Sequence, residues 1–223
     1  MAVCVALLGG ESSGKSTLAA ALQQRLQDLH GLRAMAVPEH LRAWCEAQGR
    51  APHAHEQAAI AAEQSRLIAT ALQTPGVDVV IADTTALMVA AYSALYFQDH
   101  SLLAPALAQQ RTVDLTLLMG LDLPWTPDGL FRDSPAVRDA TDALLRRELQ
   151  GEGIGFQTVY RQGEARVQQA LRAVGTALGQ PLLAEDPALS GGVRPWACEN
   201  CSDPACERRL FTGLLANAPA TQP

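Results

Sequence analysis

The segment Gly9–Thr17, GGESSGKST, has the residue types and spacing that a phosphate-binding site needs. It contains the pattern G-x-x-x-x-G-K-[ST], whose glycines let the backbone wrap a phosphate and point several N–H groups at it. A short apolar run precedes the segment and a helix-like segment follows, so the helix N-terminus adds its partial positive charge. We therefore expect a P-loop that binds ATP through Gly9, Gly10, Glu11, Ser12, Ser13, Gly14, Lys15, Ser16 and Thr17.

Lys15 is the only lysine of the chain, and the other sixteen of its 17 Lys and Arg residues are arginine. An ammonium group is a compact point charge, whereas the guanidinium fork of arginine is too bulky for the interior of such a loop. We expect Lys15 to reach the β- and γ-phosphates of ATP, and Ser16 to offer its hydroxyl to Mg²⁺.

Two carboxylates follow strand-like segments further along the chain. Asp83 comes directly after VDVVIA, and Glu39 follows AMAV and one proline. The carboxyl ends of parallel strands open on one edge of a sheet, so both acids are expected beside the P-loop. We predict that Asp83 belongs to the Mg²⁺ shell, directly or through water, and that Glu39 accepts the proton of an attacking hydroxyl or holds a sugar hydroxyl. In the alternatives, Asp83 or a following threonine only caps the next helix, and Glu39 only forms an exposed ion pair with Arg42.

A loop further on, LDLPWTPDGLFRDSP, adds an aromatic residue and basic residues. Trp125 stands between prolines, where it could stack on a flat ring, and a cationic ring would suit its face best. Arg132 and Arg138 flank a helix start marked by Ser134 and Pro135, and we expect them to close on transferring phosphates. In the alternative, Trp125 anchors the loop and the arginines are solvated.

The elements that must position these residues alternate between strand-like and helix-like segments. Apolar runs of strand length cover 3–8, 34–37, 77–82, 115–121 and 156–160. Helical periodicity covers 16–30, 39–48, 53–73, 86–97, 101–110, the segment from Ser134 and Pro135 to about Leu149, and 164–178. This alternation predicts an α/β fold, a parallel sheet with helices on both faces. The pattern ends near Gly179, so we expect a P-loop domain over 1–178 and a Pro/Gly-rich tail over 179–223.

Charge and hydropathy narrow the class of protein. The net charge of −6 gives no support for a nucleic-acid-binding surface. No apolar run approaches the roughly 20 residues of a membrane span, and the N-terminus does not resemble a signal peptide. We therefore expect a cytoplasmic protein whose ligands are small molecules, and the sequence leaves its oligomeric state open.

The tail contains Cys198, Cys201 and Cys206 in the spacing C-x₂-C-x₄-C. The first pair has a common metal-chelating spacing, but a closed zinc site needs a fourth ligand, which would be Asp203, a remote His or Cys, or a residue of another subunit. A three-cysteine iron–sulfur site and unligated thiols are the alternatives to Zn²⁺.

Taken together, these motifs resemble the ribosylnicotinamide kinase domain of NadR-type NAD-salvage proteins and the related P-loop AAA-type ATPase family. The resemblance covers about residues 1–175 and rests on GGESSGKSTL, PE with an arginine three residues on, ADTT, YSALYF, and DLTLLMGLDLPWTPDGLFRD. It implies a P-loop NTPase fold of the nucleoside kinase type, with a five-stranded parallel sheet. The implied reaction transfers the γ-phosphate of ATP to the 5′-hydroxyl of nicotinamide riboside, which gives NMN.

The resemblance also assigns residues. The substrate-loop aromatic of the family falls on Trp125, and its strand-end acids fall on Glu39 and Asp83; we add Arg42 and Asp128 as candidate substrate-binding residues. No H-x-G-H nucleotidyltransferase motif occurs in the chain. The sequence is therefore expected to have kinase activity only and not to act as a repressor.

Two hypotheses of different classes follow. In the first, the chain is a riboside kinase whose catalytic residues are Lys15, Glu39, Asp83, Arg132 and Arg138. In the second, it is an ATP-dependent switch or interaction protein, with the cysteine tail as a docking or sensing element. P-loop folds serve both purposes, so the fold alone does not decide between them.

Overall fold

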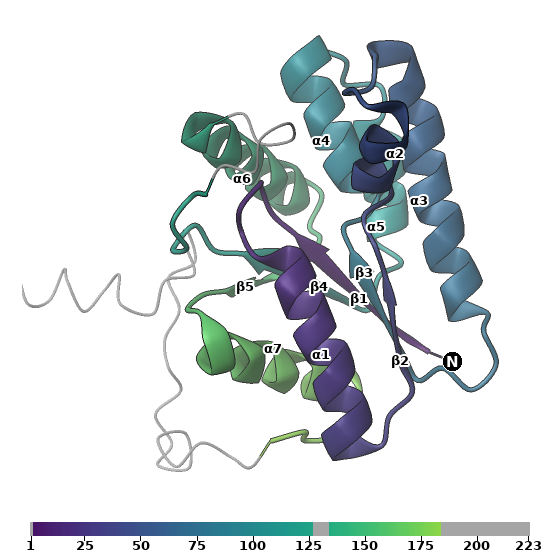
Figure 1. Ribbon diagram of the computed structural model, residues 1–223, viewed down its shortest axis with the longest axis vertical. Coiled ribbons are helices and arrows are strands. Elements are labelled where there is room, and N and C mark those ends of the chain that lie inside the picture. The colour runs from purple at the N-terminus through teal and green to yellow at the C-terminus, as the bar shows by residue number, and fades with distance from the viewer. Residues whose placement is uncertain (1, 127–133, 184–223) are drawn as a thin grey trace, which may run out of the picture. The chain divides into compact units, whose positions relative to one another are not determined.

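Five parallel strands form the centre of the molecule. The computed structural model describes residues 2–126 and 134–183, which belong to one compact unit, Met1–Leu183 (Figure 1). The strands are β1 (Val3–Leu8), β2 (Ala34–Val37), β3 (Val79–Asp83), β4 (Leu115–Met119) and β5 (Gln157–Val159). Their order in the sheet is β2-β3-β1-β4-β5, and every neighbouring pair is parallel. The predicted five-stranded parallel sheet is confirmed.

The helices follow the strands in the alternating order that the sequence predicts. They are α1 (Lys15–His30), α2 (His40–Gln48), α3 (Gln57–Leu72), α4 (Ala86–Phe97), α5 (Leu103–Gln110), α6 (Pro135–Gly151) and α7 (Gly163–Ala177), with a 3₁₀ turn η1 (Ala54–Glu56) before α3. The single helix expected over 53–73 is thus a 3₁₀ turn followed by an α-helix.

Both faces of the sheet are covered by helices, which explains why its central strands are apolar throughout. On one face, Val5 and Leu7 of β1 pack with the leucine stripe of α1 and with α7 (Figure 1). On the other, Leu8 of β1 and Leu118 of β4 pack with α3, α4, α5 and α6. Because side chains of a strand alternate between faces, β1 and β4 contribute to both of these cores. A third cluster joins Val37 of β2 and Val80 and Ala82 of β3 to α3. Burying each such leucine stabilises the fold by about 1.5–3 kcal/mol.

The ends of the elements have identifiable local causes. Ser134 caps α6, its Oγ accepting a hydrogen bond from the Val137 N–H at 3.3 Å, and Pro135 occupies the first turn as predicted. β4 ends at Met119, two residues earlier than expected. At Gly120 the chain passes close to Tyr160, whose ring would lie 2.4 Å from an added Cβ. In residues 2–126 and 134–183, no helix is both long and apolar enough to cross a membrane.

Candidate active site

The loop between β1 and α1 has a backbone that requires its glycines. Gly9 and Gly14 have φ angles of 144° and 79°, a region that side chains other than hydrogen rarely allow. Gly10 is needed for another reason, because a Cβ there would lie 2.8 Å from Cγ of Arg138 and 2.9 Å from its carbonyl oxygen. The first turn of α6 therefore packs directly against the phosphate-binding loop.

The Lys15 ammonium lies inside this loop, at the start of α1. Its Nζ donates hydrogen bonds to the carbonyl oxygens of Gly9 at 2.8 Å and Gly10 at 3.1 Å, and the residue is 8% exposed. The Ser13 hydroxyl donates to the Gly10 carbonyl at 2.7 Å and fixes the turn. A phosphate entering the loop would meet an ammonium group already in place.

Asp83 is the last residue of β3 and lies beside Leu7 of β1, next to the start of the P-loop. It is 5% exposed, and its Oδ1 is buried without a hydrogen-bond partner among the described residues. The cap of α4 is Thr85, whose Oγ1 accepts from the Leu87 N–H at 3.3 Å, so Asp83 is not used for capping. A buried carboxylate oxygen without a partner, together with the Ser16 hydroxyl, fits the hard oxygen donors that Mg²⁺ prefers.

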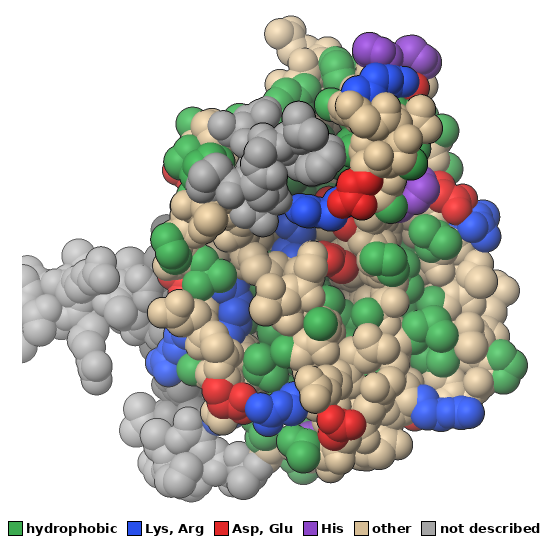
Figure 2. All heavy atoms as spheres, in the orientation of Figure 1, with side chains coloured by type: hydrophobic (Ala, Val, Ile, Leu, Met, Phe, Trp, Pro, Cys, Tyr) green, Lys and Arg blue, Asp and Glu red, His purple; other side chains and the backbone are tan. Residues whose placement is uncertain are grey.

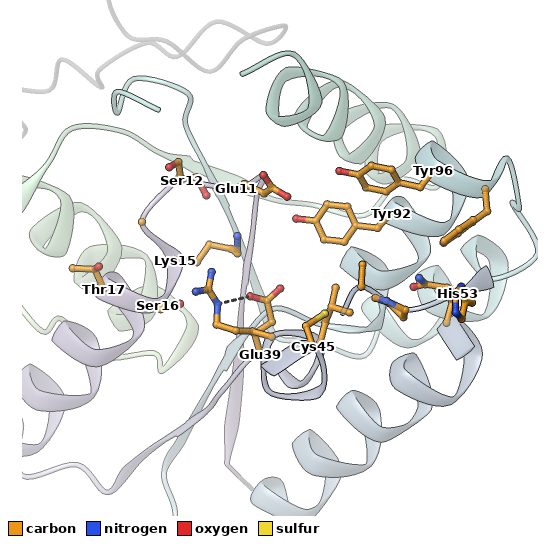
Figure 3. Close-up of a pocket in the computed structure, with 18 residues that line it drawn as sticks. Glu11, Ser12, Lys15, Ser16, Thr17, Glu39, Cys45, His53, Tyr92 and Tyr96 are labelled. Carbon is orange, nitrogen blue, oxygen red and sulfur yellow. Dashed lines mark ion pairs between the residues drawn. The ribbon is translucent and has the colours of Figure 1, made fainter. Parts of the chain in front are cut away.

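Glu39 lies at the start of α2, and its side chain is only 15% exposed. The Arg42 Nε is 3.9 Å from Glu39 Oε2, so the expected ion pair exists, but the carboxylate also faces the P-loop lysine (Figure 3). Burial raises the pKa of the Glu39 carboxyl above its usual value; Lys15 lowers this pKa, Asp83 raises it, and Arg42 lowers it. A carboxylate with a raised pKa is a better proton acceptor than an exposed one.

Gln64 of α3, to which we assigned no role from the sequence, holds both peptide groups that flank Glu39. Its Oε1 accepts from the His40 N–H at 2.7 Å, and its Nε2 is 3.4 Å from the carbonyl oxygens of Pro38 and Thr84. Thr84 follows Asp83 and has a φ of 76°, a rare conformation for a β-branched residue. Gln64 is 1% exposed, and its hydrogen bonds tie together the chain segments that carry Glu39 and Asp83.

A cavity of about 740 Å³ joins the P-loop to Glu39, a size typical of small-molecule sites. Asp83 and Gln64 are not among its lining residues. Figure 2 shows basic and acidic side chains close together near the centre of the face that it depicts. In Figure 3, the P-loop side chains lie at one end and His53 at the other, with Glu39 and Tyr92 between them. The lining residues are Glu11, Ser12, Ser13, Gly14, Lys15, Ser16, Thr17, Glu39, Leu41, Arg42, Cys45, Ala51, Pro52, His53, Gln57, Tyr92, Tyr96 and Phe97.

The aromatic wall of this cavity comes from α4, through Tyr92, Tyr96 and Phe97. The two tyrosine rings are 6.2 Å apart between centroids and are tilted by 42°. Burial raises the pKa of Tyr92 well above its usual value, and nearby Glu39 adds to the effect, so the hydroxyl stays protonated. The segment YSALYF carries the signal of such a wall, because its two tyrosines stand four residues apart and so lie on one side of a helix.

The segment after β4 lies against the P-loop. Trp125 is half-buried and is not among the described residues that line the cavity. Its buried Nε1 has no hydrogen-bond partner among the described residues. Arg138 also lies outside the lining; its Nη1 donates to the Leu123 carbonyl at 2.7 Å, and its side chain covers Gly10. The Ser12 hydroxyl joins the P-loop to Thr126, donating to its carbonyl at 2.8 Å and accepting from its N–H at 2.9 Å. The proposed roles of Trp125 and Arg138 stay predictions.

Other predicted positions lie outside the described residues: Asp128, Arg132, Cys198, Cys201 and Cys206. Their roles in substrate binding, phosphate transfer and zinc binding stay predictions. Over residues 2–126 and 134–183, no group of three His, Cys, Asp or Glu side chains could hold a metal ion.

Comparisons with known proteins place this geometry in a family. The model of the AAA domain family matches residues 4–166. No curated protein sequence matches the chain. Two crystal structures of NadR protein are similar in fold. The complex with NAD and AMP-PNP is 21% identical with a TM-score of 0.65, and the match covers 83% of this chain and 52% of that chain. The complex with NR is 22% identical with a TM-score of 0.66, and the match covers 83% of this chain and 54% of that chain. Thymidylate kinase from Ehrlichia chaffeensis is also similar in fold, with 13% identity and a TM-score of 0.56, and the match covers 78% of this chain and 98% of that chain. The chain spans about half the length of the NadR chains, and it has the P-loop kinase fold.

The contacts of Gln64 generate a prediction about stability. Replacing Gln64 by Leu leaves the Pro38 and Thr84 carbonyls and the His40 N–H without this partner in the interior, which we expect to lower the free energy of unfolding by about 1–3 kcal/mol. Urea denaturation measures the change. Gln73→Leu, at the exposed end of the same helix, is the matched control. Equal stability of the two variants would show that Gln64 does not hold these segments.

Proposed function

The chain belongs to the AAA domain family, and we propose that it is an ATP-dependent kinase that phosphorylates the 5′-hydroxyl of a riboside, with nicotinamide riboside as the favoured substrate and NMN as the product. The observation that carries the proposal is one cavity lined by the P-loop, the half-buried carboxylate of Glu39 and an aromatic wall. Such a cavity has room for the phosphates of ATP and for a small flat-ringed acceptor together. The likeness in fold to NadR and thymidylate kinase supports the same class.

At the ATP end, the P-loop amides and Lys15 would bind the phosphates. Lys15 exchanges its bonds to the Gly9 and Gly10 carbonyls for bonds to phosphate oxygens, and its position on α1 keeps it in reach during transfer. Ser16 and Asp83 would hold Mg²⁺, which supplies positive charge to the β- and γ-phosphate oxygens when bound.

At the acceptor end, Glu39 would accept the proton of the 5′-hydroxyl. The hydroxyl oxygen then bonds to the γ-phosphorus as the bond from that phosphorus to the bridging oxygen of ADP breaks. Burial of Glu39 raises its pKa, which suits proton transfer near neutral pH. The segments that Gln64 ties together keep Glu39 and Asp83 in a fixed relation.

The base would lie against the wall formed by Tyr92, Tyr96 and Phe97. The faces of these aromatic rings would attract a positively charged ring such as the pyridinium of nicotinamide riboside. Trp125 remains a proposed second stacking partner, and Arg132 and Arg138 remain proposed partners of the transferring phosphoryl group.

The first test is whether ATP consumption depends on a riboside. With Mg²⁺ and a panel of ribosides, we expect ADP formation to rise at least tenfold on adding nicotinamide riboside, and NMN to be detected by mass spectrometry. A slow ATP turnover that is the same with and without every riboside would reject the kinase and favour a switch or interaction protein.

Glu39→Gln removes the proposed proton acceptor, and we expect kcat to fall by roughly 10²- to 10⁴-fold with little change in the KM for ATP. The same variant tests the raised pKa. A raised carboxyl pKa means that the folded protein binds the proton more tightly than the unfolded chain, so ionised Glu39 destabilises the fold at neutral pH.

Glu39→Gln should therefore melt at a higher temperature than wild type at pH 8. The difference should shrink as the pH falls towards the usual glutamate pKa of 4.5, because Glu39 is then protonated in the folded protein. A difference in Tm that is constant between pH 8 and pH 4, with unchanged kcat, contradicts the role of Glu39.

Two aromatic variants separate the candidate stacking partners. Tyr96 lines the cavity but is 45% exposed, so Tyr96→Ala removes a contact to the base at little cost to the fold. We expect it to raise the KM for the riboside roughly tenfold and to leave the KM for ATP unchanged, in steady-state kinetics. If Trp125→Ala alone raises the riboside KM, the base stacks on the loop after β4 instead.

A further inference from the structure

Gln57, the first residue of α3, is a buried polar side chain of the cavity lining that the mechanism above does not use. It is 3% exposed, and its Oε1 is buried without a hydrogen-bond partner in the part of the chain that the structure describes. It differs in this from Gln64 on the same helix, whose amide oxygen and nitrogen both have backbone partners. No sequence motif points to Gln57.

An unpaired amide oxygen in the interior is unfavourable, because it gives up its hydrogen bond to water and receives nothing in exchange. Buried polar groups in folded proteins are nearly always paired, so an exception at the wall of a ligand cavity indicates a group that the ligand pairs. A leucine would fit the same position without this cost. The amide is therefore explained by binding rather than by stability.

The position of Gln57 identifies the part of the ligand that it would meet. It follows His53 by four residues, and Figure 3 shows His53 at the end of the cavity opposite Ser16 and Thr17 of the P-loop. The phosphates and the 5′-oxygen must lie at the P-loop end. The far end is therefore left for the edge of the base, with the tyrosines of α4 beside it.

We propose that Gln57 determines specificity by accepting a hydrogen bond from an N–H group on the edge of the base, either a ring amide or an exocyclic amine. The proposal rests on the proposed riboside kinase function. A base that carries a carboxylate, or only hydrogens on carbon, at that edge has no N–H to donate and leaves the Gln57 oxygen unpaired. A site built to pair with a donor rejects an analogue that lacks it by more than a site that only measures size.

The test measures dissociation constants by isothermal titration calorimetry for two pairs of ribosides. Nicotinamide riboside and nicotinic acid riboside differ in an amide against an acid. Cytidine and pyrimidin-2-one riboside differ in the presence against the absence of the exocyclic amine. The proteins are wild type, Gln57→Leu, Gln57→Glu, which keeps an acceptor oxygen, and Gln73→Leu as the control on the exposed end of α3. Kinase assays on the same samples report separately on catalysis.

We expect wild type to prefer the donor-bearing member of at least one pair by roughly tenfold to a hundredfold. The nicotinic pair also differs in charge. The contribution of Gln57 is therefore measured as the change, on mutation, in the ratio of the two dissociation constants of a pair. Gln57→Leu should lower this ratio of dissociation constants about tenfold. Gln73→Leu should keep the ratio, and Gln57→Glu should keep or raise it, because the glutamate retains an acceptor oxygen and its charge disfavours nicotinic acid riboside. Gln57→Leu should also have an equal or higher Tm than wild type, since it removes an unpaired buried polar group.

The outcomes are separable. If Gln57→Leu keeps the wild-type ratio in both pairs, or if wild type binds none of the four ribosides, Gln57 does not read the base. A Gln57→Leu variant that melts well below wild type shows a structural amide and also overturns the proposal. If the ribosides bind with the expected ratios but are not phosphorylated, the kinase function fails and the assignment of Gln57 stands.

Discussion

The parallel pairing of β1 with β3 is the constraint on which the site depends. It sets Leu7 opposite Asp83 at the point where the P-loop begins, and the Thr84 N–H donates to the Leu7 carbonyl at 3.1 Å. β2 pairs in turn with β3, with Val37 opposite Ala82, so Glu39 arrives at the same edge. Leu7 and Asp83, more than 70 positions apart in the chain, thus come together through the backbone hydrogen bonds of the sheet.

The site also concentrates polar groups that the fold itself does not satisfy. Asp83 Oδ1 and Gln57 Oε1 are buried without partners among the described residues, and the Glu39 carboxyl has a pKa raised by burial. Each feature costs stability in the empty protein and each is placed where a ligand group would relieve it. The Lys15 ammonium differs, because the Gly9 and Gly10 carbonyls hold it in place before any phosphate arrives.

Sequence reasoning succeeded where local chemistry decides the structure. The G-x-x-x-x-G-K-S pattern requires a particular backbone, and strand-end acids such as Glu39 must lie at one sheet edge once the strands are parallel. It did not identify Gln57, Gln64 or the wall that begins at Tyr92, because their neighbours come from other helices whose packing no local pattern encodes. Gln64 did carry a signal, as a polar residue on the buried side of α3, but its backbone partners are visible only in three dimensions.

We propose that ATP and the acceptor occupy one continuous cavity, with Glu39 between the P-loop and the aromatic wall (Figure 3). The most direct measurement is the affinity of a bisubstrate compound that joins an adenosine polyphosphate to the 5′-oxygen of nicotinamide riboside, determined by calorimetry with Mg²⁺. We predict that it binds at least about a hundredfold more tightly than a non-hydrolysable ATP analogue, because its second half binds without a separate loss of translational freedom. A bisubstrate compound that binds no more tightly than the ATP analogue would show that ATP and the riboside do not share this cavity.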